Sequence, residues 1–389
     1  MVMQEIIRLR EQSREYGRLR IVVLAPSEEP VPPRTYGGSE LVAYNVTEEL
    51  VRRGHEVYLI AAGTSTTSAI LVPIAEKSFR EVYANSPLKN SPSEYQALRE
   101  YWNVKCAVEA TAIIRSLKPD IVHNHIDWLG VVLQNLMPCP IMTTMHNLIK
   151  FETQKRAILE NPNGNFVSIS NNQRKDLPQA NWGATIYNGI DVNMFSVGSG
   201  DGGYFAFLGR ICPEKGCAEV CRIVKSLGFP HRLKIAAKID AVNMEYYETE
   251  VKPLIDGVQI EYIGEVDFDG KNALLKDAKA LLLWLNWEEP FGLVVAEANA
   301  CGTPVVVNRR GSMLEVIEDG VNGILVNTTE EMRDALDKVA DLDRSKCRAY
   351  VESRFDVKHM VDGYEKFART IVGSTLQSDN AKLITNDLF

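Results

Sequence analysis

The sequence predicts an α/β protein made of two doubly wound domains that face each other across a cleft. Its 389 residues, 45% of them hydrophobic and 24% charged, are ordinary for a globular protein and enough for two hydrophobic cores. Unbroken apolar runs alternate with segments of helical periodicity, as in parallel sheets covered by helices on both faces. A glycine-rich stretch at 197–210 interrupts this alternation and marks a domain boundary.

Residues 1–18 are predicted to form a helical extension before the first domain. Ile6 and Leu9 stand there among alternating acids and bases, which is typical of a helix of modest amphipathicity. The favoured interpretation of its arginines is a solvated helix packed on the protein. A weak peripheral contact with anionic lipid at the inner membrane face is the alternative.

The first domain is predicted over 19–197 and begins with a βαβ unit. "RIVVLAP" at 20–26 is an apolar run that ends at turn residues, as a strand buried on both faces does. A segment of helical spacing follows and stops at Gly54, and a second strand follows that helix. This second strand is predicted at 56–61, and the later strands near 120–123, 140–145 and 166–169. A long helix is predicted at 94–117.

The second domain is predicted over 198–355, after a flexible link at 198–203. Ligands of doubly wound sheets bind at the carboxyl ends of the strands, so the default site is the cleft between the domains. The polar residues at 374–389 are predicted to form a flexible tail. The strands of this domain are predicted near 204–208, 233–237, 259–263, 280–284, 303–307 and 323–326.

Composition and charge exclude several classes of protein. Asp and Glu number 51 against 43 Lys and Arg, and the resulting net charge of −8 argues against nucleic acid as a partner. The seven cysteines are odd in number and scattered, as in a reducing compartment. No apolar run has the length of a membrane span, and the charged start is unlike a signal peptide. We therefore expect a cytoplasmic protein.

Two motifs with glycines and cations are predicted to line the cleft. Gly37 and Gly38 in "TYGGSE" precede a helix, where they let the backbone approach a ligand and present amides to an anion. A plain turn before a helix is the alternative for this motif. Arg210 and Lys215 in "GRICPEKG" follow the first strand of the second domain, and a planar fork beside a point charge suits a diphosphate.

The third motif, "EEPFGLVVAE", carries Glu289 and Glu297. On one helix they would stand about 12 Å apart, which is too far for the acid and nucleophile of a glycosidase. Pro290 and Gly292 predict instead that a helix begins near Phe291 or Gly292, with Glu289 on a loop and Glu297 inside the helix. The two carboxylates could then hold two ends of one extended ligand. The ligand-binding residues predicted in this motif are Glu289, Phe291, Gly292, Leu293, Val294 and Glu297.

Two clusters that could suggest metal sites are set aside. "HNHID" at 123–127 has a spacing found in metallohydrolases, but Trp128 stands where a further histidine is usual. Cys212, Cys217 and Cys221 have a spacing that fits no zinc template, and packing in a helix is the better account of the last two. No metal site is therefore predicted.

The chain resembles the retaining glycosyltransferases of family four, which have the GT-B fold of two Rossmann-like domains. "EEPFGLVVAE" followed by "ANACGTPVVVNRRGSMLEVIEDGVNGILV" is similar to their C-terminal signature. "YGGSE", "EELVRRGHEV", "DIVHNH", "IYNGID" and "LGRICPEKG" are similar to their other landmarks, in the same order. The resemblance covers roughly residues 19–370 and implies that a closing helix at 356–373 crosses back to the first domain.

This resemblance implies a role for each motif. Glu297 would bind the ribose diol of a sugar nucleotide, Glu289 the transferred hexose, and Arg210 with Lys215 the diphosphate. The Gly-Gly turn would approach the donor from the first domain, and His146 in "TTMHN" would lie at the floor of the active site. A structural histidine at a strand end is the alternative for His146. The predicted catalytic residues are His146, Arg210, Lys215 and Glu289.

The chain departs from the family pattern at three places. Gly311-Ser312 and Leu314-Glu315 stand where Gly-Gly and Pro-Glu are usual, and Asn147 stands where another His or an Asp is usual. These changes concern the sugar contacts and the acceptor geometry.

The implied function is a retaining hexosyltransferase that needs no metal or other cofactor besides its nucleotide diphosphate sugar. UDP-glucose is the favoured donor and GDP-mannose the second. The acceptor hydroxyl could belong to a small molecule, a glycan or a lipid-linked sugar. A sugar-nucleotide epimerase of the same fold and a non-catalytic sugar-nucleotide-binding protein are the alternatives.

Overall fold

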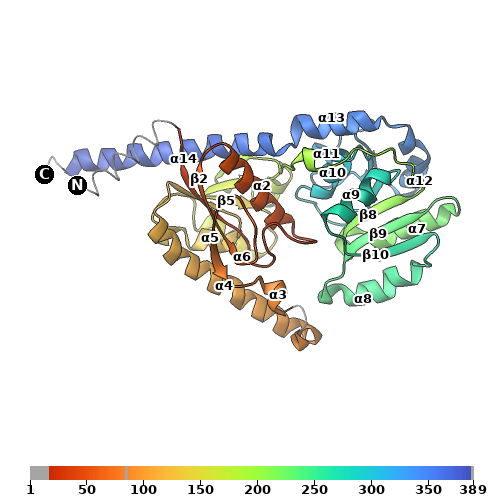
Figure 1. Cartoon of the computed structure of the whole chain (residues 1–389), viewed down its shortest axis with the longest axis horizontal. Helices are drawn as coiled ribbons and strands as arrows, with labels where there is room; N and C mark the ends of the chain where they lie inside the picture. Colours follow the sequence, from red (N-terminus) through yellow and green to blue (C-terminus); the bar gives the residue numbers. More distant parts are fainter. Residues whose placement is uncertain (1–16, 84–85, 387–389) are drawn as a thin grey trace.

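The computed structural model describes residues 17–83 and 86–386, which form two α/β domains side by side (Figure 1). The predicted N-terminal helix at 1–18 lies almost wholly outside the described residues. In Figure 1 the first domain runs from red to yellow on the left, and the second from green to blue on the right. Helix α14 (Val357–Asn386) runs from the second domain along the first.

The first domain is a parallel sheet in which the described strands number seven, in the order β3-β2-β1-β4-β5-β6-β7. Each predicted strand is confirmed, and the sheet has two edge strands, β3 and β7, that sequence reasoning missed. β3 contains Pro73 and is half-exposed, and β7 contains Gly183, so neither is a continuous apolar run. The strands are β1 (Arg20–Leu24), β2 (Glu56–Ala62), β3 (Ile70–Ala75), β4 (Ile121–Asn124), β5 (Ile141–Met145), β6 (Asn165–Ser168) and β7 (Trp182–Thr185).

Helices cover both faces of this first sheet. α2 and α14 pack on one face, where Val46 and Val361 are fully buried against Val23 of β1. α4 covers the other face through buried residues such as Ala110 and Ile114. The helices of this domain are α2 (Gly38–Arg52), α3 (Phe79–Tyr83), α4 (Pro92–Leu117), α5 (Trp128–Val132) and α6 (Glu152–Leu159).

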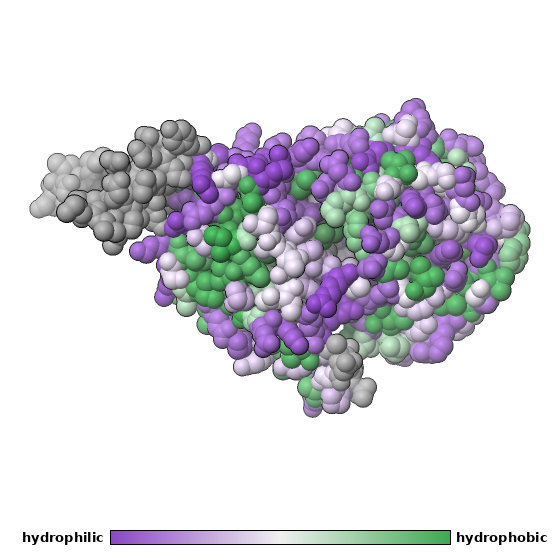
Figure 2. Space-filling view, in the orientation of Figure 1, coloured by the Kyte–Doolittle hydropathy of each residue, from purple (hydrophilic) through white to green (hydrophobic). Residues whose placement is uncertain are grey.

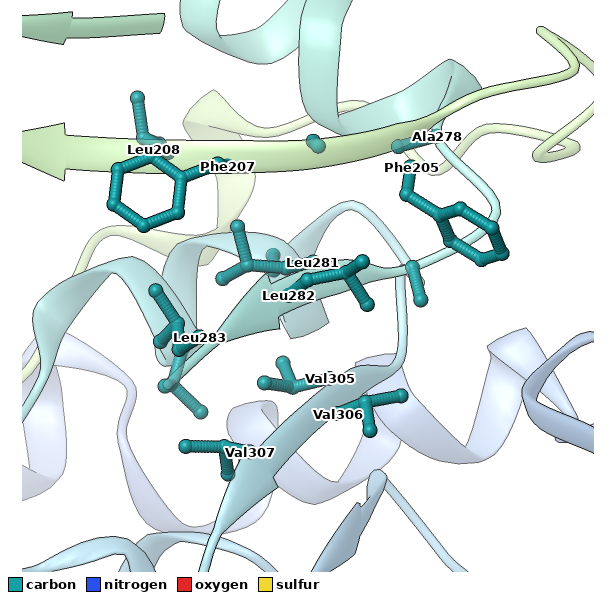
Figure 3. Packing of buried hydrophobic residues seen from close by; sticks show 14 of the residues in the cluster. Phe205, Phe207, Leu208, Ala278, Leu281, Leu282, Leu283, Val305, Val306 and Val307 are labelled. Carbon is teal, nitrogen blue, oxygen red and sulfur yellow. The ribbon is translucent and has the colours of Figure 1, made fainter. Parts of the chain in front are cut away.

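The second domain has, within the described chain, a six-stranded parallel sheet in the order β10-β9-β8-β11-β12-β13. All of its predicted strands are confirmed. Figure 3 shows why they are apolar runs: Phe207, Leu282 and Val306 lie on three neighbouring strands inside one core. The strands are β8 (Phe205–Arg210), β9 (Leu233–Lys238), β10 (Ile260–Gly264), β11 (Leu281–Leu283), β12 (Val305–Asn308) and β13 (Gly323–Val326). The helices are α7 (Cys217–Leu227), α8 (Met244–Tyr246), α9 (Phe268–Asp277), α10 (Leu293–Ala300), α11 (Met313–Val316), α12 (Thr329–Lys338) and α13 (Arg344–Arg354).

Two segments of the chain meet where the domains join. Ile190 forms a parallel bridge with Asp356. Ile190 N donates to Phe355 O (2.9 Å), and Val357 N donates to Ile190 O (2.8 Å). The chain therefore leaves the first domain and returns to it through two adjacent strands of backbone, which are hydrogen-bonded to each other.

The prediction of a flexible link between the domains at 198–203 is wrong, because this segment is packed on the second domain. Gly198 N donates to Cys301 O (3.1 Å), and Arg344 Nε donates to Gly198 O (2.8 Å), which holds this segment against the second domain. A Cβ atom on Gly198 would lie 2.0 Å from Lys276 O. Glycine is needed here for close packing against backbone rather than for flexibility.

The closing helix returns to the first domain, as the resemblance implied. Tyr364 and Val361 of α14 are buried in the core beside α2. The helix continues to Asn386, past its predicted end at 373, so most of the predicted tail is helical. Neither α14 nor any other helix in the described part of the chain is long and apolar enough to cross a bilayer.

The two sheets direct their carboxyl ends toward a common region. Strand order reverses between β1 and β4 in the first sheet and between β8 and β11 in the second. Ligands of doubly wound sheets bind at such reversals, because the loops there separate and leave a crevice. The predicted site residues follow β1, β5, β8 and β11 in sequence.

Candidate active site

Glu289 and Glu297 are held on different elements, as predicted. Glu289 lies on the loop after β11, and Glu297 lies inside α10. Gly292 sits at the start of α10 with a φ of 83°, a left-handed conformation that suits glycine. Both carboxylates are buried, Glu289 at 6% exposure and Glu297 at 2%. A buried carboxylate needs a counter-charge or hydrogen bonds, and each of these two has a lysine.

Lys215 is the counter-charge of Glu289. Its Nζ forms an ion pair with Glu289 Oε2, and Trp287 Nε1 donates to the same oxygen (3.0 Å). Lys215 Nζ also lies 5.1 Å from the centre of the Trp287 ring. Burial acts to lower the pKa of Lys215, but the Glu289 carboxylate outweighs it and the pKa is raised, so Lys215 stays charged.

Lys271 is the counter-charge of Glu297, and sequence reasoning missed it. Its Nζ, on α9, forms an ion pair with Glu297 Oε1, and its side chain is only 15% exposed. In the sequence, Lys271 is visible only as one lysine near the start of a predicted helix. Sequence alone does not distinguish such a lysine from a solvated one, because its partner lies on another element.

Arg210 lies at the end of β8 and faces the first domain. Its guanidinium carbon lies 6.0 Å from the centre of the Tyr36 ring, which belongs to the loop before α2. Its one ion pair among the described residues is a loose contact with Asp240, 3.7 Å between Nη1 and Oδ2. Arg210 therefore keeps donors for a ligand, whereas Lys215 and Lys271 are engaged with carboxylates.

Gly38 brings the first domain against the start of α10. A Cβ atom built on Gly38 would lie 3.6 Å from Leu293 Cδ1, so the N-termini of α2 and α10 are neighbours. Gly37 has an extended backbone, with a φ of 175°, and its lack of a side chain serves packing: a Cβ there would lie 2.7 Å from Pro33 Cβ. Two helix N-termini with Arg210 and Lys215 beside them form a region that attracts an anion.

The helix amides at this place are those of Leu293 and Val294, which lack intrahelical partners because they are in the first turn of α10. The side chain of Phe291 does not point to a ligand. It is 1% exposed and packs on Phe355, with ring centres 5.5 Å apart. The predicted contact of Phe291 with the donor therefore falls to its backbone, and it stays a prediction.

The loop after β12 is hydrogen-bonded to the backbone of the loop that carries Glu289. Ser312 N donates to Glu289 O (2.9 Å), and Ser312 Oγ donates to Phe291 O (3.0 Å). Gly311 has a φ of 62°, and a Cβ atom there would lie 2.4 Å from Glu289 N. The Gly311-Ser312 departure from the family pattern thus fixes the backbone that carries Glu289.

His146 lies at the end of β5, where it joins a second histidine and an aspartate. His146 Nε2 and His125 Nδ1 are 2.9 Å apart, and His146 N donates to Asp127 Oδ1 (2.8 Å). Asn147 Nδ2 donates to Asp127 Oδ2 (2.6 Å), so Asn147 braces the aspartate. Asp127 has a φ of 48°, a strained conformation that is typical of functional sites.

The histidines of "HNHID" are therefore used for hydrogen bonding. His123 Nε2 contacts Thr144 Oγ1 (2.9 Å), which donates in turn to Tyr364 OH on α14 (3.1 Å). Within the described residues no group of three or more His, Cys, Asp or Glu side chains is arranged to hold a metal ion. Three of the cysteines pack in the second core with at most 1% exposure: Cys212, Cys217 and Cys221.

The His125–His146 contact sets where the protons lie. Burial lowers the pKa of His146 to about 4 and holds the pKa of His125 well below its usual value, so both rings are neutral and carry one proton each. His125 Nε2 is buried and has no hydrogen-bond partner among the described groups. A buried N–H without a partner is rarer than a free lone pair, so the proton of His125 lies on Nδ1 and is donated to His146 Nε2.

We expect NMR of protein labelled with ¹⁵N-histidine to show His125 and His146 as neutral Nδ1–H tautomers at pH 7. The protein has six histidines, so His125→Asn and His146→Asn assign the two signals by loss. A proton on Nε2 of His146 would contradict this arrangement. His231, which lies in the second domain, serves as the reference signal that neither variant should move.

Hydrogen bonds across the cleft hold the two domains together. Arg80 Nη2 donates to both oxygens of Glu265 (2.8 Å each). Glu315 of α11 accepts from the backbone amides of Asn171 (2.8 Å) and Asn172 (2.7 Å). Figure 2 shows hydrophilic residues, drawn in purple, where the domains meet. Glu315, which matches the family pattern, thus supplies a carboxylate that bridges the domains, and the departure at this place is Leu314.

Two protein-family models match the chain, and together they span both domains. One is described as Glycosyltransferase Family 4 and matches residues 36–194. The other is described as Glycosyl transferases group 1 and matches residues 191–354. The two matches meet at 191–194, beside the bridge between Ile190 and Asp356.

Relatives with assigned names cover nearly the whole chain. D-inositol 3-phosphate glycosyltransferase of Mycolicibacterium smegmatis is 26% identical over 88% of this chain and 89% of the relative. N-acetyl-alpha-D-glucosaminyl L-malate synthase of Bacillus anthracis is 24% identical over 89% of this chain and 97% of the relative.

Solved structures share the arrangement of the two domains. AviGT4, a glycosyltransferase involved in avilamycin A biosynthesis, has a TM-score of 0.70 and 21% identity, and the match covers 91% of this chain and 98% of AviGT4. HepE of Anabaena, solved with UDP-glucose, has a TM-score of 0.66 and 17% identity, covering 93% of this chain and 100% of HepE. At these identities the likeness shows the fold alone.

Proposed function

The chain belongs to the glycosyltransferases of group 1 and family 4, with the GT-B fold, and on that premise we propose that it transfers a hexose from a nucleotide diphosphate sugar to a hydroxyl acceptor with retention of configuration. The observation that carries the proposal is the anion-binding region. The N-termini of α2 and α10 meet there beside Arg210 and Lys215, and they come from both domains.

In the proposed reaction this anion-binding region stabilises the nucleotide diphosphate, which is the leaving group. The bond between the anomeric carbon and a diphosphate oxygen breaks, and the acceptor oxygen forms a bond on the same face of the sugar. The acceptor proton passes to the departing phosphate oxygen. Negative charge therefore grows on the diphosphate in the transition state, where prepositioned cations and helix amides act on it without reorganisation.

The carboxylates of Glu297 and Glu289 would bind the two ends of the donor, the ribose and the hexose. Glu297 lies inside α10 and would accept hydrogen bonds from the ribose diol, while Glu289 lies on the loop and would meet the hexose. Each carboxylate is already oriented by a lysine, Lys271 for Glu297 and Lys215 for Glu289. His146 would donate its Nδ1–H toward the sugar or the acceptor from the first domain.

We favour UDP-glucose as the donor and place GDP-mannose second, and HepE, of the same fold, was solved with UDP-glucose. We also propose that no metal ion is required. Arg210 and Lys215 supply the positive charge that a divalent cation supplies to diphosphates in other folds.

A donor panel followed by product analysis tests this function. Thermal stability is measured with UDP-glucose and with GDP-mannose, with and without excess EDTA, because a ligand that binds the folded state raises the melting temperature. The protein is then incubated with the stabilising donor and an acceptor extract, and the products are analysed by mass spectrometry and by NMR of the anomeric proton. We expect acceptor-dependent release of the nucleotide and a retained configuration, with EDTA present.

Other outcomes identify the alternatives. An epimerised donor without transfer would indicate an epimerase, and binding without any reaction would indicate a binding protein. Activity that is lost in EDTA and restored by Mg²⁺ or Mn²⁺ would overturn metal independence.

A further inference from the structure

Helix α4 is apolar on two opposite faces, and only the inner face packs on the protein. The inner face contacts the first sheet through buried residues such as Ala110 and Ile114. The outer face carries three large apolar side chains, Tyr101 at 63%, Val104 at 46% and Val108 at 52% exposure. Figure 1 shows α4 along the outer edge of the first domain. A continuous apolar patch at a protein surface is typical of an interaction site.

The exposed residues have the spacing of a coiled-coil seam. Ala97, Tyr101, Val104 and Val108 follow one another at steps of four, three and four residues, and all four are exposed. Side chains at these steps form one stripe along a helix, which we call the α4 stripe. A second helix packs along such a stripe by placing its own side chains between those of the first. The spacing therefore favours a helix as the partner.

The charges beside the α4 stripe fit a second copy of the same helix. With Tyr101 and Val108 at a positions of the heptad, Glu100 occupies a g position and Lys105 the next e position. In a parallel pair of helices, a g residue of one helix lies beside the next e residue of the other. Glu100 of each copy would therefore meet Lys105 of the other copy, and the two-fold symmetry of such a pair forms this contact twice.

Both charged groups now make only exposed contacts within α4. Lys105 Nζ lies 2.9 Å from the carboxylate of Glu109. Glu100 Oε1 accepts a hydrogen bond from Gln96 Nε2 (3.1 Å). Exposed pairs one turn apart on a helix contribute little to stability, so these side chains can turn to a partner at low cost.

The acidic residues of α4 argue against a lipid surface as the occupant of this face. Glu94, Glu100 and Glu109 are all exposed. A helix that lies on a membrane carries mainly lysine and arginine on its polar side, because the headgroups include anionic lipids. Alternating acids and bases fit a protein partner with the complementary pattern, which the same helix supplies.

We propose that two copies of this chain associate through α4, with the two helices side by side and parallel about a two-fold axis. Tyr101, Val104 and Val108 of each copy pack against the same residues of the other. Contacts between Glu100 and Lys105 flank this apolar centre on both sides. The inference goes beyond the transferase function and does not depend on it.

The apolar patch continues beyond α4. Leu136, in the 3₁₀ turn Gln134–Leu136, is half-exposed, and its carbonyl accepts from Arg115 Nε of α4 (3.1 Å). The contact surface thus includes this turn as well as the helix. It is still at the small end of specific interfaces, so we expect a weak dimer with a Kd on the order of 10 µM.

Sedimentation equilibrium of the whole protein tests the association. Between about 1 and 200 µM, a range that spans this Kd, the average mass should rise from that of one chain toward that of two. Val104→Glu puts a charge on the α4 stripe and should keep the protein monomeric. Val258→Glu makes the same change at another exposed valine, in the second domain, and should leave the association unaltered. Circular dichroism and the melting temperature show whether each variant is folded.

Two results of this measurement would overturn the inference. One is a protein that stays monomeric over the whole range. The other is a dimer that persists in a folded Val104→Glu protein, which would place the interface elsewhere. Monomeric protein that binds vesicles of phosphatidylglycerol and phosphatidylcholine, but not when it carries Val104→Glu, would assign the α4 stripe to a membrane surface instead.

An exchange of charges tests the parallel arrangement. Glu100→Lys and Lys105→Glu each replace two attractive contacts by two repulsive ones, so each alone should raise the Kd about tenfold or more. The double variant reverses both charges and should return the Kd to within about threefold of the original. A double variant that associates as weakly as the single variants would overturn the pairing of Glu100 with Lys105.

Discussion

Arg210→Ala is expected to slow transfer by roughly 10² to 10³-fold, the usual effect of removing one group that stabilises charge in a transition state. The reason is the position of Arg210 at the end of β8, facing the loop before α2, where its one ion pair within the described part of the chain is the loose contact with Asp240. Because that pair is weak, the melting temperature should change little. Initial rates with saturating donor, and the melting temperature, are the measurements.

Lys215→Ala should slow transfer to a similar degree and should also destabilise the protein. It leaves the buried carboxylate of Glu289 without its cation, and breaking a buried pair costs about 3–5 kcal/mol. The contrast between the two variants separates catalysis from folding. Arg222→Ala is the control, because Arg222 is half-exposed on α7 and pairs with Glu250 away from the cleft. Normal turnover of a folded Arg210→Ala protein would show that this arginine is structural.

Gly311→Ala is expected to reduce transfer by about 10²-fold or more, although the residue touches no donor. Its Cβ would lie 2.4 Å from Glu289 N and 2.6 Å from Glu289 O, which are backbone atoms that cannot turn aside. The loop that carries Glu289 must therefore shift, and a displacement of about 1 Å at a catalytic group costs on that order in rate. The measurement is kcat and KM for the donor, with the melting temperature.

Gly320→Ala is the matched control for Gly311→Ala. Gly320 has a φ of 79°, in the same left-handed region, but a Cβ there meets nothing within 4 Å. Both variants carry the strain of placing alanine at positive φ, about 1–2 kcal/mol, and only Gly311→Ala carries the clash with Glu289. Equal activity of the two variants would show that the loop after β12 does not position Glu289.

The placement of the main site residues was predictable because parallel strands end at a common edge. Arg210 follows an apolar run that could be recognised as a strand, and Glu289 follows another. Pro290 and Gly292 indicated the start of α10, which separates Glu289 from Glu297. Each of these inferences depends on residues close together in the chain.

The missed features depend on partners that are distant in the chain. Lys271 was not distinguishable from a surface lysine until α9 and α10 packed together and placed it beside Glu297. His125 and His146 follow different strands, and only the pairing of β4 with β5 brings their rings together. The link at 198–203 was misread because glycine serves both flexible segments and close packing, and Gly198 serves the second.

The sequence by itself determined the two doubly wound domains, the order of the motifs and the family, because apolar periodicity and turn residues act over short stretches of chain. Only the tertiary structure decided which charges are compensated. Lys215 and Lys271 have carboxylate partners, whereas Glu40 has no basic partner among the described residues and faces a cavity. The physical reason is that the electrostatic environment of a side chain depends on burial and on neighbours from other elements, and folding alone assembles these.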